Sequence, residues 1–77
     1  MKIVKIDIID MAYSTGTYST EEAQTFKPVN MSCVGFLVAA HNDCYVIAKD
    51  YQPEEGAFRH LSAIPKVNVV KVNVLRR

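Results

Sequence analysis

The stretch from Val29 to Asp50, VNMSCVGFLVAAHNDCYVIAKD, predicts a β-hairpin. Two apolar runs, Ser32–Ala40 and Cys44–Ala48, flank a polar break, His-Asn-Asp, at positions 41–43. Runs of β-forming residues on both sides of a short Asn/Asp turn are typical of two antiparallel strands. Both alternating sets of side chains in the first run are apolar, whereas a strand with one exposed face alternates apolar with polar residues. We therefore expect this strand to be covered on both faces.

Upstream, residues 2–11 predict a first strand, because Val4, Ile6 and Ile8 share one face and charged residues fall between them. Residues 12–20, AYSTGTYST, are rich in small hydroxyl residues around a glycine and predict a loop. The chain is thus expected to reach the hairpin through one strand and a polar connection.

A short helix is expected between this loop and the hairpin, over residues 20–26. Ser19 and the glutamate three residues after it form a capping box, which marks a helix N-terminus. Pro28 prevents the helix from continuing. Ala23 and Phe26 are expected to pack on its inner side.

Two more strands are predicted downstream of a loop at 51–57, over residues 58–64 and 67–75. The alternation slips within the last segment, which a single turn over 65–68 or a β-bulge explains. Five short strands and one helix predict a mainly β fold, a small five-stranded SH3-like or Sm-like barrel that occupies residues 1–77 as one domain.

Composition narrows the class of protein. The 77 residues carry a net charge of +1, which argues against duplex nucleic acid as the main partner, although Lys71, Arg76 and Arg77 form a small basic end. No apolar segment is long enough to cross a membrane and no signal peptide is recognisable, so we expect a cytoplasmic protein.

The short chain also predicts a homo-oligomer. A domain of this length buries only about 60% of its unfolded surface, so its core is thin. A second subunit could cover the otherwise unpartnered face of the first hairpin strand. The expected interface residues are Val34, Phe36 and Val38.

The cysteines and histidines give no specific signature of catalysis or metal binding. In the predicted hairpin Cys33 and Cys44 lie roughly 20 Å apart, too far for a disulfide, so both are expected to be buried free thiols. His41-x-x-Cys44 has metal-like spacing, but no second close pair accompanies it. No local sequence signature of a catalytic Cys-His pair surrounds either cysteine or His60. We expect no metal, no cofactor and no enzymatic activity.

Several short motifs resemble those of a group of small phage and prophage proteins of uncharacterised function. The hairpin string Val-Gly-Phe-Leu-Val at 34–38 and the Ile-Pro-Lys turn at 64–66 carry the likeness. Upstream, Glu21-Glu22-Ala23 matches the start of the helix in that group, while its two tryptophan positions are Ile8 and Tyr18 here. The resemblance implies a protein that acts in the cytoplasm of a bacterial host, and it brings no catalytic residues.

The hydroxyl-rich loop is the candidate ligand site, because loops carry binding residues more often than the scaffold does. It offers hydroxyl and backbone donors ahead of a helix, with tyrosines that could stack on a base, but it lacks the lysine of a phosphate-binding loop. Basic side chains after the second loop could add positive charge, or could protect a sheet edge. The candidate residues are Asp10, Tyr13, Ser14, Thr15, Gly16, Tyr18, Arg59, His60 and Lys66.

We therefore expect a non-enzymatic phage accessory protein that binds a host component. The most specific version of this hypothesis is an anti-defence protein that sequesters a nucleotide signal or a host protein. One alternative is an Sm-like oligomer that binds RNA or DNA. The other is a structural or assembly protein of the virion.

Overall fold

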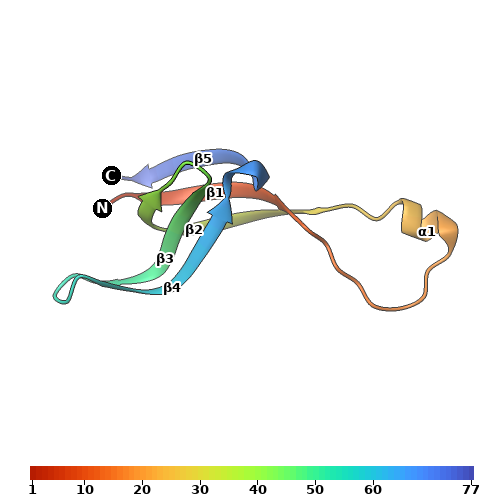
Figure 1. Ribbon diagram of the computed structural model, residues 1–77, viewed down its shortest axis with the longest axis horizontal. Coiled ribbons are helices and arrows are strands. Elements are labelled where there is room, and N and C mark those ends of the chain that lie inside the picture. The colour runs from red at the N-terminus through yellow and green to blue at the C-terminus, as the bar shows by residue number, and fades with distance from the viewer.

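In the computed structural model, residues 1–77 form one five-stranded antiparallel sheet, a short helix and a single 3₁₀ turn (Figure 1). The strands are β1 (Ile3–Asp10), β2 (Val29–Ala40), β3 (Cys44–Gln52), β4 (Ala57–Pro65) and β5 (Val69–Arg76), with helix α1 (Thr20–Gln24) and turn η1 (Lys66–Asn68). The predicted mainly β fold with five strands and one helix is confirmed. The turn before the last strand is the predicted one.

The sheet has the strand order β4-β3-β2-β1-β5, so β4 and β5 are its two edges. The predicted closure into a barrel is not observed, because the sheet remains open between these edges. The sheet is nevertheless strongly curled. Five flat strands would set the edges roughly 19 Å apart, whereas the connection from Pro65 to Val69 reaches at most about 14 Å.

The β2–β3 hairpin is as predicted, but β2 has two different neighbours along its length. Residues 29–36 pair with β1, and residues 36–40 pair with β3. The two sets overlap only at Phe36, where β3 turns away from β2. Gly35 permits this crossing, because a Cβ there would lie 2.6 Å from the Ala48 carbonyl oxygen. The strands β2 and β3 therefore form a fork that opens toward the start of β2.

The core lies on one face of the curled sheet. Val4, Ile6 and Ile8 of β1 are buried there with Ile47 of β3 and Ile64 of β4. This confirms the predicted inward face of the first strand. The core is small, since only seven of the 77 residues are buried, as the length of the chain predicts.

The opposite face is not covered within the chain, so the predicted cover of the first hairpin strand by a second subunit stays a prediction. Val34 is 51% exposed and Val38 is 37% exposed. Phe36 differs from them because it contacts Tyr51, whose ring in turn stacks on Phe58 with centroids 4.9 Å apart. This aromatic row also shortens the predicted second loop, since β3 and β4 extend through these residues.

The molecule is elongated, with extents of 54 × 22 × 21 Å. Its radius of gyration is 16.1 Å, against about 11.5 Å for a compact domain of this length. Figure 1 shows why: α1 and its flanking loops project to the right, away from the sheet, and the β3–β4 hairpin projects to the lower left. The two termini lie together at the end of the sheet opposite α1. No helix of the protein has the length and apolar character that crossing a membrane requires.

Candidate functional site

The projecting segment between β1 and β2, residues 11–28, is the candidate functional site, and we call it the arm. Its two ends are neighbours in the sheet, since Asp10 pairs with Val29. Apolar side chains are exposed along the arm: Met11 is 81% exposed, Tyr13 82% and Phe26 53%. Long connections in small domains generally serve a function. Apolar side chains exposed together on a protein surface typically mark a site of interaction.

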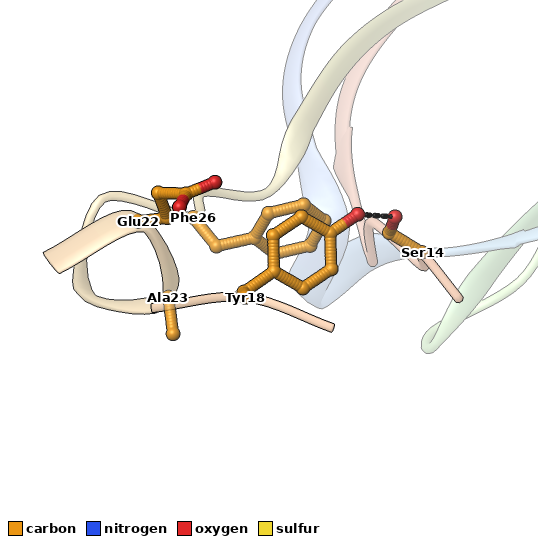
Figure 2. Close-up of a pocket in the computed structure, with 5 residues that line it drawn as sticks. All are labelled: Ser14, Tyr18, Glu22, Ala23 and Phe26. Atoms are coloured by element: carbon orange, nitrogen blue, oxygen red, sulfur yellow. Dashed lines mark hydrogen bonds between the residues drawn. The ribbon is translucent and has the colours of Figure 1, made fainter. Parts of the chain in front are cut away.

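The arm folds around a small cavity of about 210 Å³ (Figure 2). The residues that line it are Ser14, Tyr18, Glu22, Ala23 and Phe26. Figure 2 shows the Tyr18 hydroxyl turned toward Ser14, to which it is hydrogen-bonded, and the Phe26 ring beside the same space. Ala23 and Phe26, expected to pack inward, instead line this open cavity, and no residue of α1 is buried. Tyrosine and phenylalanine faces make the cavity mainly apolar.

Local sequence explains the shape of the arm. The Ser19 hydroxyl accepts a hydrogen bond from the Glu22 backbone N–H at 3.2 Å, as the capping box predicts. Gly16 has a φ of +132°, a conformation that other residues rarely adopt, and it lies beside the Tyr18 ring. The helix ends at Gln24, two residues before the predicted end, since the Thr25 hydroxyl donates to the Glu22 carbonyl at 2.8 Å.

The charge of the cavity does not suit a phosphate. Its one charged lining residue is the acidic Glu22, and no lysine or arginine lines it. A second cleft of about 220 Å³ shares Phe26 with this cavity, and Lys27 lines that cleft together with Met11. Phosphate recognition generally relies on cations or several aligned N–H groups. One copy of the arm therefore presents an apolar and weakly acidic surface.

The predicted ligand residues fall in separate places. The part of the arm between β1 and α1 contains five of them: Tyr13, Ser14, Thr15, Gly16 and Tyr18. Asp10 closes β1, and its carboxylate accepts a hydrogen bond from the next backbone N–H at 2.8 Å. The predicted basic residues are not brought to the arm. Arg59 and His60 lie in β4, at the edge of the sheet farther from β1, and Lys66 begins η1; none of the three lines the cavity of the arm.

His60 and Lys66 each contact another side chain of the same chain. His60 lies 3.5 Å from the Asp50 carboxylate and has a φ of +59°, uncommon for a residue with a side chain. Lys66 lies over the Tyr45 ring at 4.9 Å from the centroid, which is a cation–π contact. The structure thus assigns both residues local contacts within the sheet and its edge.

Two titratable groups of the sheet have shifted pKa values. The pKa of Asp7 is lowered, first because the Ser32 hydroxyl donates to its carboxylate at 2.6 Å, and then by Lys5 and Lys71; partial burial opposes this. Burial and the neighbouring Asp43 raise the pKa of the Cys44 thiol. A raised pKa disfavours the thiolate that a nucleophile or a metal ligand requires.

Both cysteines are free thiols, and they are half-buried rather than fully buried as expected. No three histidine, cysteine or acidic side chains come together in a group that could hold a metal ion. Sequence reasoning missed Met11 and Phe26 as exposed surface. The sequence pattern assigns Met11 to the first strand and Phe26 to the helix, whereas β1 ends at Asp10 and α1 ends at Gln24.

Comparison with known proteins finds no match among protein-family models, curated proteins or solved structures.

Proposed function

We propose that this protein is a non-enzymatic phage accessory protein that binds a host protein through the arm. The observation that carries the proposal is the exposure of aromatic and apolar side chains on a segment that projects from the sheet. Monomeric proteins rarely expose such residues together, and tyrosine and phenylalanine are enriched at the centres of protein interfaces. The phage resemblance and its implied bacterial cytoplasm support the host assignment.

A protein partner suits the arm better than a nucleotide. The cavity beside Tyr18 and Phe26 is lined by apolar groups and Glu22, which would repel a phosphate. An apolar side chain of a partner could fill it, as anchor residues do at interfaces. The nucleotide form of the proposal requires a second subunit to supply cations, since Arg59, His60 and Lys66 are held elsewhere in the same chain.

The test compares proteins captured from host extract by the wild type and by a Tyr13→Ala/Phe26→Ala variant. Both side chains are more than half exposed, so the variant is expected to fold with unchanged stability. We expect at least one host protein to be captured by the wild type and lost with the variant. Val67→Ala is the matched control, because Val67 is 92% exposed in η1, outside the arm.

Three outcomes count against the proposal. The first is an identical set of captured proteins for the wild type and the arm variant. The second is thermal protection of the wild type by a nucleotide, which would favour the nucleotide form. The third is capture of a virion component, which would favour the assembly role.

We also propose that the fold is an open form of an SH3-like or Sm-like barrel. Its support is the connection through η1, which brings the two edge strands, β4 and β5, together at one corner of the sheet. Closure would then need only these two strands to approach along the rest of their length.

A further inference from the structure

We propose that two copies of this chain pair through the unpaired edge of β2, antiparallel, about a two-fold axis at Met31. This surface is distinct from the arm, and it makes the protein a homodimer with a continuous sheet. We call residues 29–34 of β2 the open edge. They pair with β1 on one side and with no strand on the other, since β2 and β3 pair only from Phe36 onward.

The open edge lacks the protection that the other free edges carry. Exposed strand edges are normally protected by charged side chains or proline, because unpaired N–H and C=O groups invite another strand. The β4 edge carries Arg59 and the β5 edge carries Lys71. In contrast, no Lys, Arg, Asp or Glu occurs between Lys27 and Lys49 except Asp43 in the turn. The open edge is therefore the one suited to pairing with a second strand.

The open edge is complementary to itself. Strand pairing about a two-fold axis perpendicular to the sheet places like faces on the same side. With Met31 opposite its own copy, Val29 lies opposite Cys33 of the second subunit, and Asn30 opposite Ser32. Val29 and Met31 are 44% and 45% exposed in one chain, and their pairing would bury an apolar row. The polar residues of the other face would meet one another, and no like charges would be opposed.

The surface beside the open edge extends the contact. A cleft of about 240 Å³ lies at the fork, with Met31 and Cys33 on the β2 side and Ile47 and Lys49 on the β3 side. Its β4 wall contributes His60 and Ser62. Side chains of a second copy that cross the two-fold axis would enter this cleft, so pairing would bury side chains as well as complete a hydrogen-bond ladder.

The surface of the chain is large for its mass. It is 6023 Å², whereas a compact monomer of 8.6 kDa exposes about 4,700 Å², and the projecting arm accounts for part of the difference. A stable dimer typically buries about 800 Å² on each partner, which the open edge and the cleft beside it would have to supply together. The lack of charge on the open edge suits an identical strand.

The test is the mass of the protein in solution over a concentration series, by light scattering after gel filtration. We expect the wild type to have twice the 8.6 kDa chain mass. Met31→Lys places two lysines opposite each other at the axis and should weaken the dimer by at least about tenfold. Val67→Lys, an equally charged change at a 92% exposed site, should leave the dimer intact.

A charge exchange separates loss of the interface from loss of folding. Met31→Glu alone should also be monomeric, and an equimolar mixture with Met31→Lys should recover the dimer, because opposite charges then face each other. A wild type that is monomeric at every concentration would overturn the proposal. So would a Met31→Lys variant that stays dimeric, which would place the contact elsewhere, such as Val34 and Val38.

Cross-linking gives a second measurement if the lysine variant fails to fold. Directly opposed residues in an antiparallel pair have Cα atoms about 4.5–5.5 Å apart, which a disulfide can span. Met31→Cys in a chain with Cys33→Ala and Cys44→Ala should therefore form a covalent dimer on mild oxidation. Val67→Cys in the same background should not, and equal cross-linking of the two would contradict the pairing.

Discussion

Gly35 is the residue on which the fork between β2 and β3 depends. A side chain there would meet the Ala48 carbonyl oxygen at 2.6 Å and the Ile47 Cβ at 3.3 Å, and a backbone atom cannot move aside as the end of a side chain can. We predict that Gly35→Ala lowers the free energy of unfolding by about 1–3 kcal/mol, a typical cost of overpacking. Urea unfolding followed by circular dichroism measures it.

Gly56→Ala is the matched control for this prediction. Gly56 has a φ of +62°, but a Cβ there would have no atom within 4 Å. Its cost should therefore be only the backbone strain of a left-handed alanine, about 1 kcal/mol. If Gly35→Ala is no more destabilising than Gly56→Ala, the close approach of the strands is not the reason for the glycine.

Asp7 predicts a pH-dependent contribution to stability. Its pKa is lower in the folded chain than the unfolded value of about 3.9, so ionised Asp7 stabilises the fold above that pH. This contribution is lost as the pH falls through the folded-state pKa. Asp7→Asn should therefore be less stable than the wild type at pH 7, and the difference should shrink below about pH 4.

Urea unfolding of both proteins at neutral and acidic pH provides the measurement. Glu54→Gln removes an exposed carboxylate of the β3–β4 turn that makes no ion pair, and it should show no such convergence. A constant difference between Asp7→Asn and the wild type across this range would show that the Ser32 hydrogen bond does not depend on the charge.

At the scale of elements, the arm and the sheet are separable. Asp10 and Val29 are opposite each other, so a two-residue Asn-Gly turn can replace residues 11–28. We predict a folded sheet that is as stable as the wild type or more stable by up to about 2 kcal/mol, because a shorter loop costs less entropy. Thermal unfolding and amide exchange measure this.

The same variant should lose the host protein captured by the wild type, and it should still dimerise through the open edge. A large loss of stability on removing the arm would contradict the separation, since it would mean that the arm packs on the sheet. Loss of the dimer alone would instead assign the arm to the subunit contact.

Most elements could be predicted from the sequence because their signals are local. Alternation identified the buried face of β1, and Ser19 identified the start of α1. The length of β2 was underestimated because Val29–Met31 mixes polar with apolar residues. The first part of the arm reads as a polar loop because its hydroxyl residues outnumber its aromatic ones. Whether α1 packs on the sheet depends on tertiary contacts, which the sequence of a five-residue helix does not reveal.

At the scale of the whole molecule, the thin core was predictable from length, whereas the open sheet was not. Strand count and order are compatible with a closed barrel, and closure depends on how far β4 follows β5 after η1. The predicted ligand residues lie apart in the structure because their positions also depend on the strand order, which local sequence patterns do not reveal. The chain places Arg59 and His60 on the β4 side of the sheet, while the arm leaves from its middle strands.

The position of the termini has a practical consequence. Ile3 pairs with Arg76, so the chain starts and ends side by side, at the end of the sheet away from α1 (Figure 1). A purification tag, a fluorophore or a fused domain at either terminus would therefore extend away from the arm. One terminally labelled protein can serve for immobilisation, imaging and binding measurements with the arm unobstructed.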